Sequence, residues 1–224
     1  YDVNIPFYRA VPINMDVVKG SEIYPYDDIV TQVKQYKKFA VSQCACRNLL
    51  KTCGALNLEK NCDMETCITC GEMAEFYLEN GIAREITLEE VLAILKRSAD
   101  RGMILQTVYS KASEIICSCH AEGCGILQAA KAFGGPATKN ISNYQIEFER
   151  ETCISCGQCV ERCPMYALKM DEDNKPVEAD TSCVSCGQCV AVCPANARVL
   201  VKKESVEELP KDIFDAYRQM QVYR

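Results

Sequence analysis

The chain has 224 residues, with 25 Lys or Arg against 31 Asp or Glu, and its formal net charge is −6. This acidic balance argues against a protein that binds nucleic acid or an anionic membrane through bulk positive charge. The sequence shows neither the roughly 18–20 consecutive apolar residues of a membrane-spanning helix nor a signal-peptide pattern, and its length suits two modest domains or an ordinary one beside a small one.

Cysteine is the residue whose frequency is unusual: there are 17 cysteines, beside one His and no Trp. In a short secreted chain such a number would indicate disulfides. Here the number is odd, the chain is longer than a disulfide-stapled mini-domain, and the spacings are those of metal ligands. We therefore expect thiolate ligands in a reducing compartment.

The front region, residues 1–143, is expected to be a mainly helical, cysteine-rich domain. GEMAEFYLENG predicts a short helix that ends at Gly81, and Thr87-Leu88-Glu89-Glu90 is a capping box that begins another. Apolar residues at helical spacing and a Gly-Gly-Pro stop mark two more helices. The predicted helices cover 26–39, 71–81, 87–102 and 125–133, and AVSQC (40–44) is predicted as a strand that leads into the first cysteine pair.

The last third contains an internal repeat. Cys153-x2-Cys156-x2-Cys159-x3-Cys163-Pro164 recurs 30 residues later (183 − 153) as Cys183-x2-Cys186-x2-Cys189-x3-Cys193-Pro194. Three thiolates at two-residue intervals can surround one face of an iron–sulfur cluster, and Gly157 or Gly187 allows a tight turn that brings backbone N–H groups to its sulfurs. Around the two copies we expect strands at 145–148, 167–171, 175–180 and 197–203, with a turn at Asp171–Asn174.

This repeat resembles the bacterial two-cluster [4Fe–4S] ferredoxin, in which each fourth Cys ligates the opposite cluster. The resemblance covers roughly residues 144–203 and implies a ferredoxin-like domain with two [4Fe–4S] clusters. Carried onto this sequence, it assigns one cluster to Cys153, Cys156, Cys159 and Cys193, and the other to Cys183, Cys186, Cys189 and Cys163. Zinc is disfavoured here, because zinc sites rarely use three evenly spaced ligands followed by Cys-Pro.

The other nine cysteines (17 less the eight of the repeat) lie in the front region. A Cys-x-Cys pair on extended backbone can place both thiolates on one metal, and Cys67-x2-Cys70 is a second chelating pair. We expect one or two further [4Fe–4S] clusters: a third on Cys44, Cys46, Cys62 and Cys67, and a fourth on Cys117, Cys119 and Cys124 completed by Cys70 or Cys53. Two alternatives stay open, namely a zinc site built from Cys44, Cys46 and two later thiols, and free buried cysteines that pack as small apolar residues.

Several runs of the front region, among them CACR, ETCITCGEMAEFYLENGIAREITLEEVLAIL and ICSCHAEGCGIL, are similar to a group of dicluster iron–sulfur proteins from anaerobes. In that group an N-terminal cysteine-rich region precedes the ferredoxin module, and the resemblance covers most of residues 5–200. The sequence departs from the group at 120–123, where His-Ala-Glu-Gly stands in a normally denser cysteine run, and in the shorter 62–67 spacing. Because exposed [4Fe–4S] clusters are oxygen-labile, we expect a cytoplasmic protein of an anaerobe.

The function expected is electron transfer, by an iron–sulfur subunit that relays low-potential electrons (on the order of −400 mV or below) between a redox donor and a catalytic oxidoreductase partner. The sequence shows no glycine-rich nucleotide loop or Walker motif, and a single His leaves little for a serine-type triad, so a non-catalytic subunit is expected. The alternative is a reductase subunit whose front-region cluster itself reduces a substrate such as a disulfide. A cluster-based sensor is disfavoured, because the sequence shows no basic recognition helix.

Three features of the sequence are open to more than one interpretation. His120 is a cluster ligand, a hydrogen-bond donor to a cluster sulfur or a solvated side chain, and Arg47 either offsets thiolate charge or is an exposed arginine. Residues 204–224 predict a C-terminal amphipathic helix with Ile213, Phe214, Tyr217 and Met220 on one face, which docks on a partner or packs back on the front region. The expected fold is thus α+β: a helical cysteine-rich domain (1–143), a dicluster ferredoxin domain (144–203) and a tail (204–224).

Overall fold

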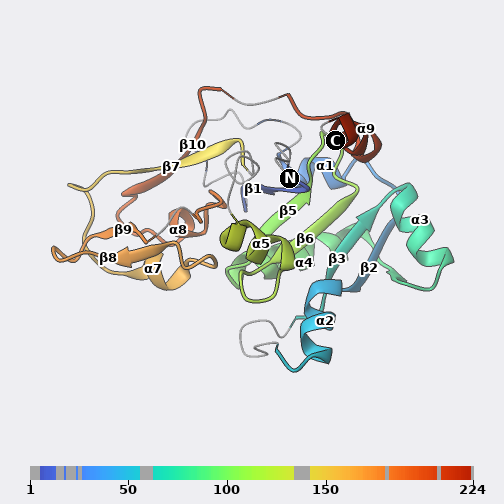
Figure 1. Ribbon diagram of the computed structural model, residues 1–224, viewed down its shortest axis with the longest axis horizontal. Coiled ribbons are helices and arrows are strands. Elements are labelled where there is room, and N and C mark those ends of the chain that lie inside the picture. The colour runs from blue at the N-terminus through green and yellow to red at the C-terminus, as the bar shows by residue number, and fades with distance from the viewer. Residues whose placement is uncertain are drawn as a thin grey trace.

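The computed structural model describes residues 6–13, 18, 24, 27–55, 63–133, 142–179, 182–205 and 208–222. A six-stranded antiparallel sheet organises the front region, in the order β1-β5-β6-β3-β2-β4 (Figure 1). Its strands are β1 (Tyr8–Val11), β2 (Phe39–Gln43), β3 (Glu65–Cys70), β4 (Arg84–Glu85), β5 (Ile104–Val108) and β6 (Ile115–Cys119). The expectation of a mainly helical front region is therefore not confirmed, because a sheet forms its centre.

The helices of the front region follow the predictions more closely. They are α1 (Ile29–Val33), α2 (Ala45–Thr52), α3 (Glu72–Glu79), α4 (Leu88–Asp100) and α5 (Gly125–Phe133). The predicted cap of α4 is confirmed, since the Thr87 hydroxyl accepts a hydrogen bond from the Glu90 N–H at 3.3 Å. Helix α1 is shorter than predicted because β2 already begins at Phe39, and α2 was not predicted.

Successive side chains of a strand point to opposite faces of a sheet, and the two faces here differ in chemistry. One face presents Ile68, Leu105 and Ile116 to α4 and forms the main apolar core. The other face, which we call the thiol face, presents Ile104 and Cys119 to α5 and to the repeat region. In Figure 1, α5 lies between the six-stranded sheet and the strands of the repeat.

Among the strands that the sequence did not predict, the central β5 and β6 lack the alternation that marks a strand exposed on one side. All five residues of β5 are buried, so the segment is a short apolar run that periodicity alone cannot assign. In β6, Ile-Ile-Cys-Ser-Cys is buried except for the half-buried Cys117. Cysteine spacing in this segment was interpreted as a ligand motif rather than as a strand signal.

The repeat region forms two small antiparallel ladders. β7 (Tyr144–Phe148) pairs with β10 (Arg198–Lys202), and β8 (Leu168–Met170) pairs with β9 (Pro176–Glu178), so all four predicted strands are confirmed. The Asp171 carboxylate accepts hydrogen bonds from the N–H groups of Asp173 (3.0 Å) and Lys175 (2.8 Å) and fixes the predicted turn. The short helices α7 (Gln158–Arg162) and α8 (Gln188–Ala191) contain the third cysteine of each copy.

The repeat region packs directly on the front region. Gln188 donates hydrogen bonds from Nε2 to the carbonyls of Ala99 (3.1 Å) and Met103 (2.7 Å), and Arg162 Nη2 donates to the same Ala99 carbonyl (2.7 Å). Val18 forms a parallel bridge with Leu200 of β10. These contacts, together with shared apolar cores, join the two regions into one packed unit.

The tail packs back on the front region. Helix α9 (Ile213–Val222) places Ile213 in one core with Val108 and Ile115, and the Tyr217 ring lies 5.7 Å from the Phe7 ring. Of the two expected placements of the tail, docking on a partner or packing on the front region, the structure has the packing on the front region, although Phe214 is 68% exposed. The side chain of Met220 lies outside the described residues. Among the described helices, none combines the length and apolarity that crossing a bilayer requires.

Candidate metal centres

Each copy of the repeat winds its backbone through the left-handed region at equivalent positions. Gly157 (φ 75) matches Gly187 (φ 85), and Ser155 (φ 60) matches Ser185 (φ 51). Left-handed residues in a turn direct successive backbone N–H groups to one side and form an anion-binding concavity. One such contact is visible in the first copy, where the Ser155 N–H donates to Cys153 Sγ at 3.4 Å.

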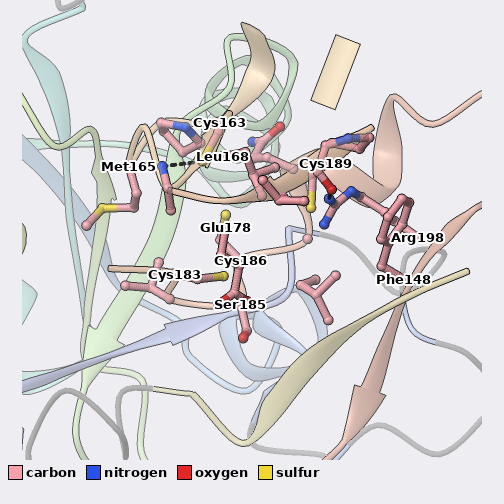
Figure 2. Close-up of a pocket in the computed structure, with 18 of the residues that line it drawn as sticks. Phe148, Cys163, Met165, Leu168, Glu178, Cys183, Ser185, Cys186, Cys189 and Arg198 are labelled. Carbon is pink, nitrogen blue, oxygen red and sulfur yellow. Dashed lines mark hydrogen bonds between the residues drawn. The ribbon is translucent and has the colours of Figure 1, made fainter. Parts of the chain in front are cut away.

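The second copy surrounds a cavity of about 440 Å³ that four cysteines line, and we call them the proximal tetrad: Cys163, Cys183, Cys186 and Cys189. Figure 2 shows these four side chains around the cavity, with Cys163 coming from the first copy and the other three from the second. Burial raises the pKa of the Cys189 thiol to about 12 and raises the pKa of Cys186 well above its usual value. A coordinated metal ion would favour the thiolate form of these buried thiols.

The first copy surrounds a smaller cavity of about 20 Å³, lined by the distal tetrad: Cys153, Cys156, Cys159 and Cys193. Here Cys193 comes from the second copy and the other three from the first. Backbone N–H groups also reach the fourth cysteines, since Ala167 donates to Cys163 Sγ (3.4 Å) and Ala197 to Cys193 Sγ (3.2 Å). Each cavity therefore gathers four thiols, with N–H donors directed at the sulfurs.

Arg198 lies between the two tetrads and lines both cavities. Its side chain is 6% exposed, its guanidinium stacks 4.6 Å from the centre of the Phe148 ring, and its Nε has no hydrogen-bond partner among the described residues. In the distal tetrad, burial raises the pKa of Cys159, and a hydrogen bond from Arg198 opposes that rise. Figure 2 shows the same guanidinium directed toward Cys189 of the proximal tetrad. The sequence analysis missed this residue, because one arginine in a strand carries no motif.

Comparison with known proteins identifies the repeat region. Residues 145–208 match the family model of the 4Fe-4S dicluster domain. The chain is 35% identical over 83 residues to a NADH-quinone oxidoreductase subunit I of Pelobacter propionicus, a match that covers 34% of this chain and 44% of that protein. It is 42% identical over 36 residues to a ferredoxin of Pyrobaculum islandicum, across 16% of this chain and 34% of that protein. The chain thus spans less than half the length of either relative, and its dicluster domain is an iron–sulfur domain.

The two halves of the dicluster domain have different surroundings although their sequences repeat. In the first copy Ile154 is 64% exposed, whereas its counterpart Val184 is 5% exposed. Cys156 is likewise exposed, and its counterpart Cys186 is buried. The front region therefore covers the second copy at Val184 and Cys186, whereas the first copy exposes Ile154 and Cys156.

In the front region, six cysteines predicted to serve two separate clusters converge at one place on the thiol face. Side-chain hydrogen bonds link them in the order Cys44–Cys46–Cys124–Cys119–Cys117–Cys67, and an electrostatic contact between Cys67 and Cys44 closes what we call the six-thiol ring. Within the ring, hydrogen bonds from Cys124 and Cys44 lower the pKa of Cys46 to about 2, and bonds from Cys119 and Cys67 lower that of Cys117. The two predicted ligand groups thus form one site.

Two other predicted ligands, Cys70 and Cys53, lie elsewhere. Cys70 is three residues from Cys67 in the same strand, so it faces the opposite side of the sheet and packs in the main apolar core. Cys53 is exposed at the C-terminal end of α2. Cys62 lies outside the described residues. The structure therefore does not bring Cys70 or Cys53 to Cys117, Cys119 and Cys124.

Two side chains that the sequence left open have definite surroundings. Arg47 is 1% exposed and donates to the Asp63 carbonyl (2.6 Å), the Thr66 hydroxyl (2.8 Å) and the Ser118 carbonyl. The interpretation of Arg47 as an exposed arginine is wrong. His120 is also buried: its Nδ1 accepts the Glu122 N–H at 3.3 Å, and its ring packs 5.6 Å from the Tyr166 ring of the dicluster domain.

Proposed function

We propose that this chain transfers electrons and that the proximal and distal tetrads each hold one [4Fe–4S] cluster. The observation that supports the ligand assignment is that each cavity is lined by four cysteines, three from one copy of the repeat and one from the other. Four thiols, inward N–H groups and a nearby buried arginine fit an anionic iron–sulfur group. When bound, such clusters supply one-electron transfer; the chain holds them in place, excludes water and sets their charge environment.

The partner is proposed to dock beside the distal tetrad. Ile154, next to Cys153, is a large apolar side chain that is 64% exposed, and the equivalent surface of the second copy is covered by the front region. Partners are proposed to be redox proteins of an oxidoreductase complex, which the similarity to part of a NADH-quinone oxidoreductase subunit supports. The same proposal includes a non-catalytic role and a cytoplasmic location in an anaerobe. It also divides the chain into a cysteine-rich domain (1–143), a dicluster domain (144–203) and a tail (204–224).

Iron and acid-labile sulfide analysis of the anaerobically purified chain tests the ligand assignment. We expect the two tetrads to contribute about 8 of the iron atoms in each chain, and we expect low-potential EPR signals after reduction. Cys156→Ser should alter the signal of the distal cluster, and Cys186→Ser that of the proximal cluster. Cys53→Ser, on the exposed end of α2, is the control and should leave both unchanged. A colourless preparation, or one that contains zinc in place of iron, would contradict the proposal.

Electron transfer to an external protein tests the docking side. With cytochrome c as acceptor, Ile154→Asn is expected to lower the second-order rate several-fold without changing iron content. Ile82→Asn removes an apolar side chain of similar exposure, 50%, from the front region and serves as the matched control. Equal effects of the two substitutions would exclude the Ile154 surface as the docking side.

A further inference from the structure

The six-thiol ring is built by long-range strand pairing rather than by a sequence motif. Cys44 and Cys46 lie at the start of α2, Cys67 comes from β3, Cys117 and Cys119 come from β6, and Cys124 directly precedes α5. Register in the sheet explains the meeting: Ser42 pairs with Cys67, Gln106 pairs with Cys117, and all face the same side. Ordinary core packing does not require six thiols in mutual contact.

Next to the ring lies the buried guanidinium of Arg47, which has no carboxylate partner in the part of the chain that the structure describes. Among the described residues, Arg47 donates to two backbone carbonyls, to the Thr66 hydroxyl and to Met103 Sδ (3.7 Å), all of them neutral acceptors. Its Nε has no hydrogen-bond partner in that part of the chain. A buried guanidinium without a counter-charge is costly, so the site is arranged for an anionic group. Arg47 immediately follows Cys46 and contributes electrostatically to the pKa of both Cys44 and Cys46.

Two helix N-termini also face the ring. Cys44 is the N-cap of α2, and Cys124 precedes the first residue of α5. The backbone N–H of Gly125 donates to Cys46, and that of Leu127 donates to Cys124. Such N–H groups stabilise negative charge on sulfur. Cys44, Cys46, Cys67 and Cys117 are half-buried, and Cys119 and Cys124 are buried.

We propose that the six-thiol ring binds a third iron–sulfur cluster, with Arg47 as its buried counter-charge. This inference deepens the proposed electron-transfer function and rests on it. One four-iron cluster needs four thiolates and two clusters would need eight, so six thiols support one additional cluster rather than two. Among the described residues no three His, Cys, Asp or Glu side chains converge on a single metal ion. The same holds for the proximal and distal tetrads, whose thiols likewise do not converge on one ion.

The third site lies next to the proximal tetrad. Cys119 and Cys124 of the ring share one core with Cys186 and Met165 of the dicluster domain. The segment between the two ring cysteines is anchored there as well, since the Ala121 N–H donates to the Pro164 carbonyl at 3.1 Å. The order of sites is therefore ring, proximal tetrad, distal tetrad. The ring extends the path of electrons into the front region.

Iron content of the full chain, with and without the ring thiols, tests this inference. The unmodified chain should contain about 12 iron atoms, and the triple variant Cys46→Ala, Cys117→Ala, Cys124→Ala should contain about 8. The double variant Cys53→Ala, Cys70→Ala removes two cysteines outside the ring and should keep about 12. Should the triple variant fail to fold, EPR of the reduced unmodified chain gives an independent answer. Its integrated signal should correspond to about three spins per chain if three clusters are present and to about two if only the tetrads hold clusters.

The outcomes separate this inference from the function on which it rests. About 8 iron atoms in the unmodified chain, with the ring thiols open to alkylation by iodoacetamide, would overturn the third site and leave the two tetrads intact. One zinc ion beside 8 iron atoms would overturn it as well. Fewer than 8 iron atoms would instead show that the assignment of the tetrads is wrong. Arg47→Met should lower iron content from about 12 toward 8, whereas a structural role of Arg47 alone predicts loss of folding with no selective loss of the third cluster.

Discussion

Gln188 offers a test of the contact between the two regions, because the repeat supplies its own control. Gln188 is fully buried; it donates to the carbonyls of Ala99 and Met103, and its Oε1 accepts from Arg162 Nε at 2.8 Å. Three hydrogen bonds at about 1 kcal/mol each predict that Gln188→Ala lowers the free energy of unfolding by about 3 kcal/mol. For a chain of this size that corresponds to a fall in Tm of roughly 6–12 °C.

The control is Gln158, which occupies the same position in the first copy and is exposed. Gln158→Ala should change the free energy of unfolding by less than about 0.5 kcal/mol, as surface substitutions do. The measurement is anaerobic thermal unfolding followed by circular dichroism, with iron content determined for both variants. Equal destabilisation by the two substitutions would refute the reasoning, because the hydrogen bonds to the carbonyls of Ala99 and Met103 distinguish the two positions.

Three further predictions concern charged side chains, two of them buried and one exposed. Arg198→Gln should lower the reduction potentials of the dicluster domain by roughly 60–130 mV, which is a charge-assisted hydrogen bond of about 1.5–3 kcal/mol expressed for one electron; a redox titration followed by EPR measures this, with the exposed Arg150→Gln as control. Arg9→Ala leaves Asp27, which is 1% exposed, without its ion-pair partner and should destabilise the fold by about 3–5 kcal/mol in denaturant unfolding. Lys96→Ala breaks an ion pair whose side chains are 77% and 63% exposed and should cost less than about 1 kcal/mol.

The dicluster domain was predictable from sequence because the residues that determine each cysteine loop are close together in the chain. Two-residue spacing, a left-handed glycine and a proline after the fourth cysteine determine the loop around each cavity within a dozen residues. The flanking strands alternate, and the Asp171 turn has ordinary turn chemistry. Cysteine spacing could not predict that Arg198 lies between the tetrads, because its position follows from the pairing of β10 with β7.

The front region was harder, because its cysteines meet through strand order and not through spacing. Cys67-x2-Cys70 was interpreted as a chelating pair, which is correct only when the residues between them form a loop. In a strand an odd separation places two side chains on opposite faces, and β3 is a strand. Conversely, Cys117 and Cys119 are two residues apart in β6 and share a face, which period-two spacing indicates in hindsight.

The tail shows a different limit. Its apolar stripe predicted a helix with one buried face, and in α9 Ile213 packs against Val108 and Ile115, whereas Phe214 of the same stripe is exposed. The pattern of a single helix carries no information about which surface covers it, so the partner and the chain's own front region were equally compatible with the sequence.

The two copies of the repeat have different surroundings, so the two ends of the dicluster domain are not equivalent. Duplication yields two equivalent loops, but the core that includes Ala10, Cys119 and Cys124 takes in Val184 and Cys186 from the loop of the second copy, whereas the first copy enters it only with its C-terminal residues, such as Met165 and Ala167. The covered copy is thereby placed beside the six-thiol ring, and the uncovered copy, with Ile154 at its surface, faces solvent. Electron transfer falls steeply with distance, so a relay needs one end reachable by a partner and the other end close to its next site. The packing of an antiparallel sheet against one half of a duplicated module provides both ends.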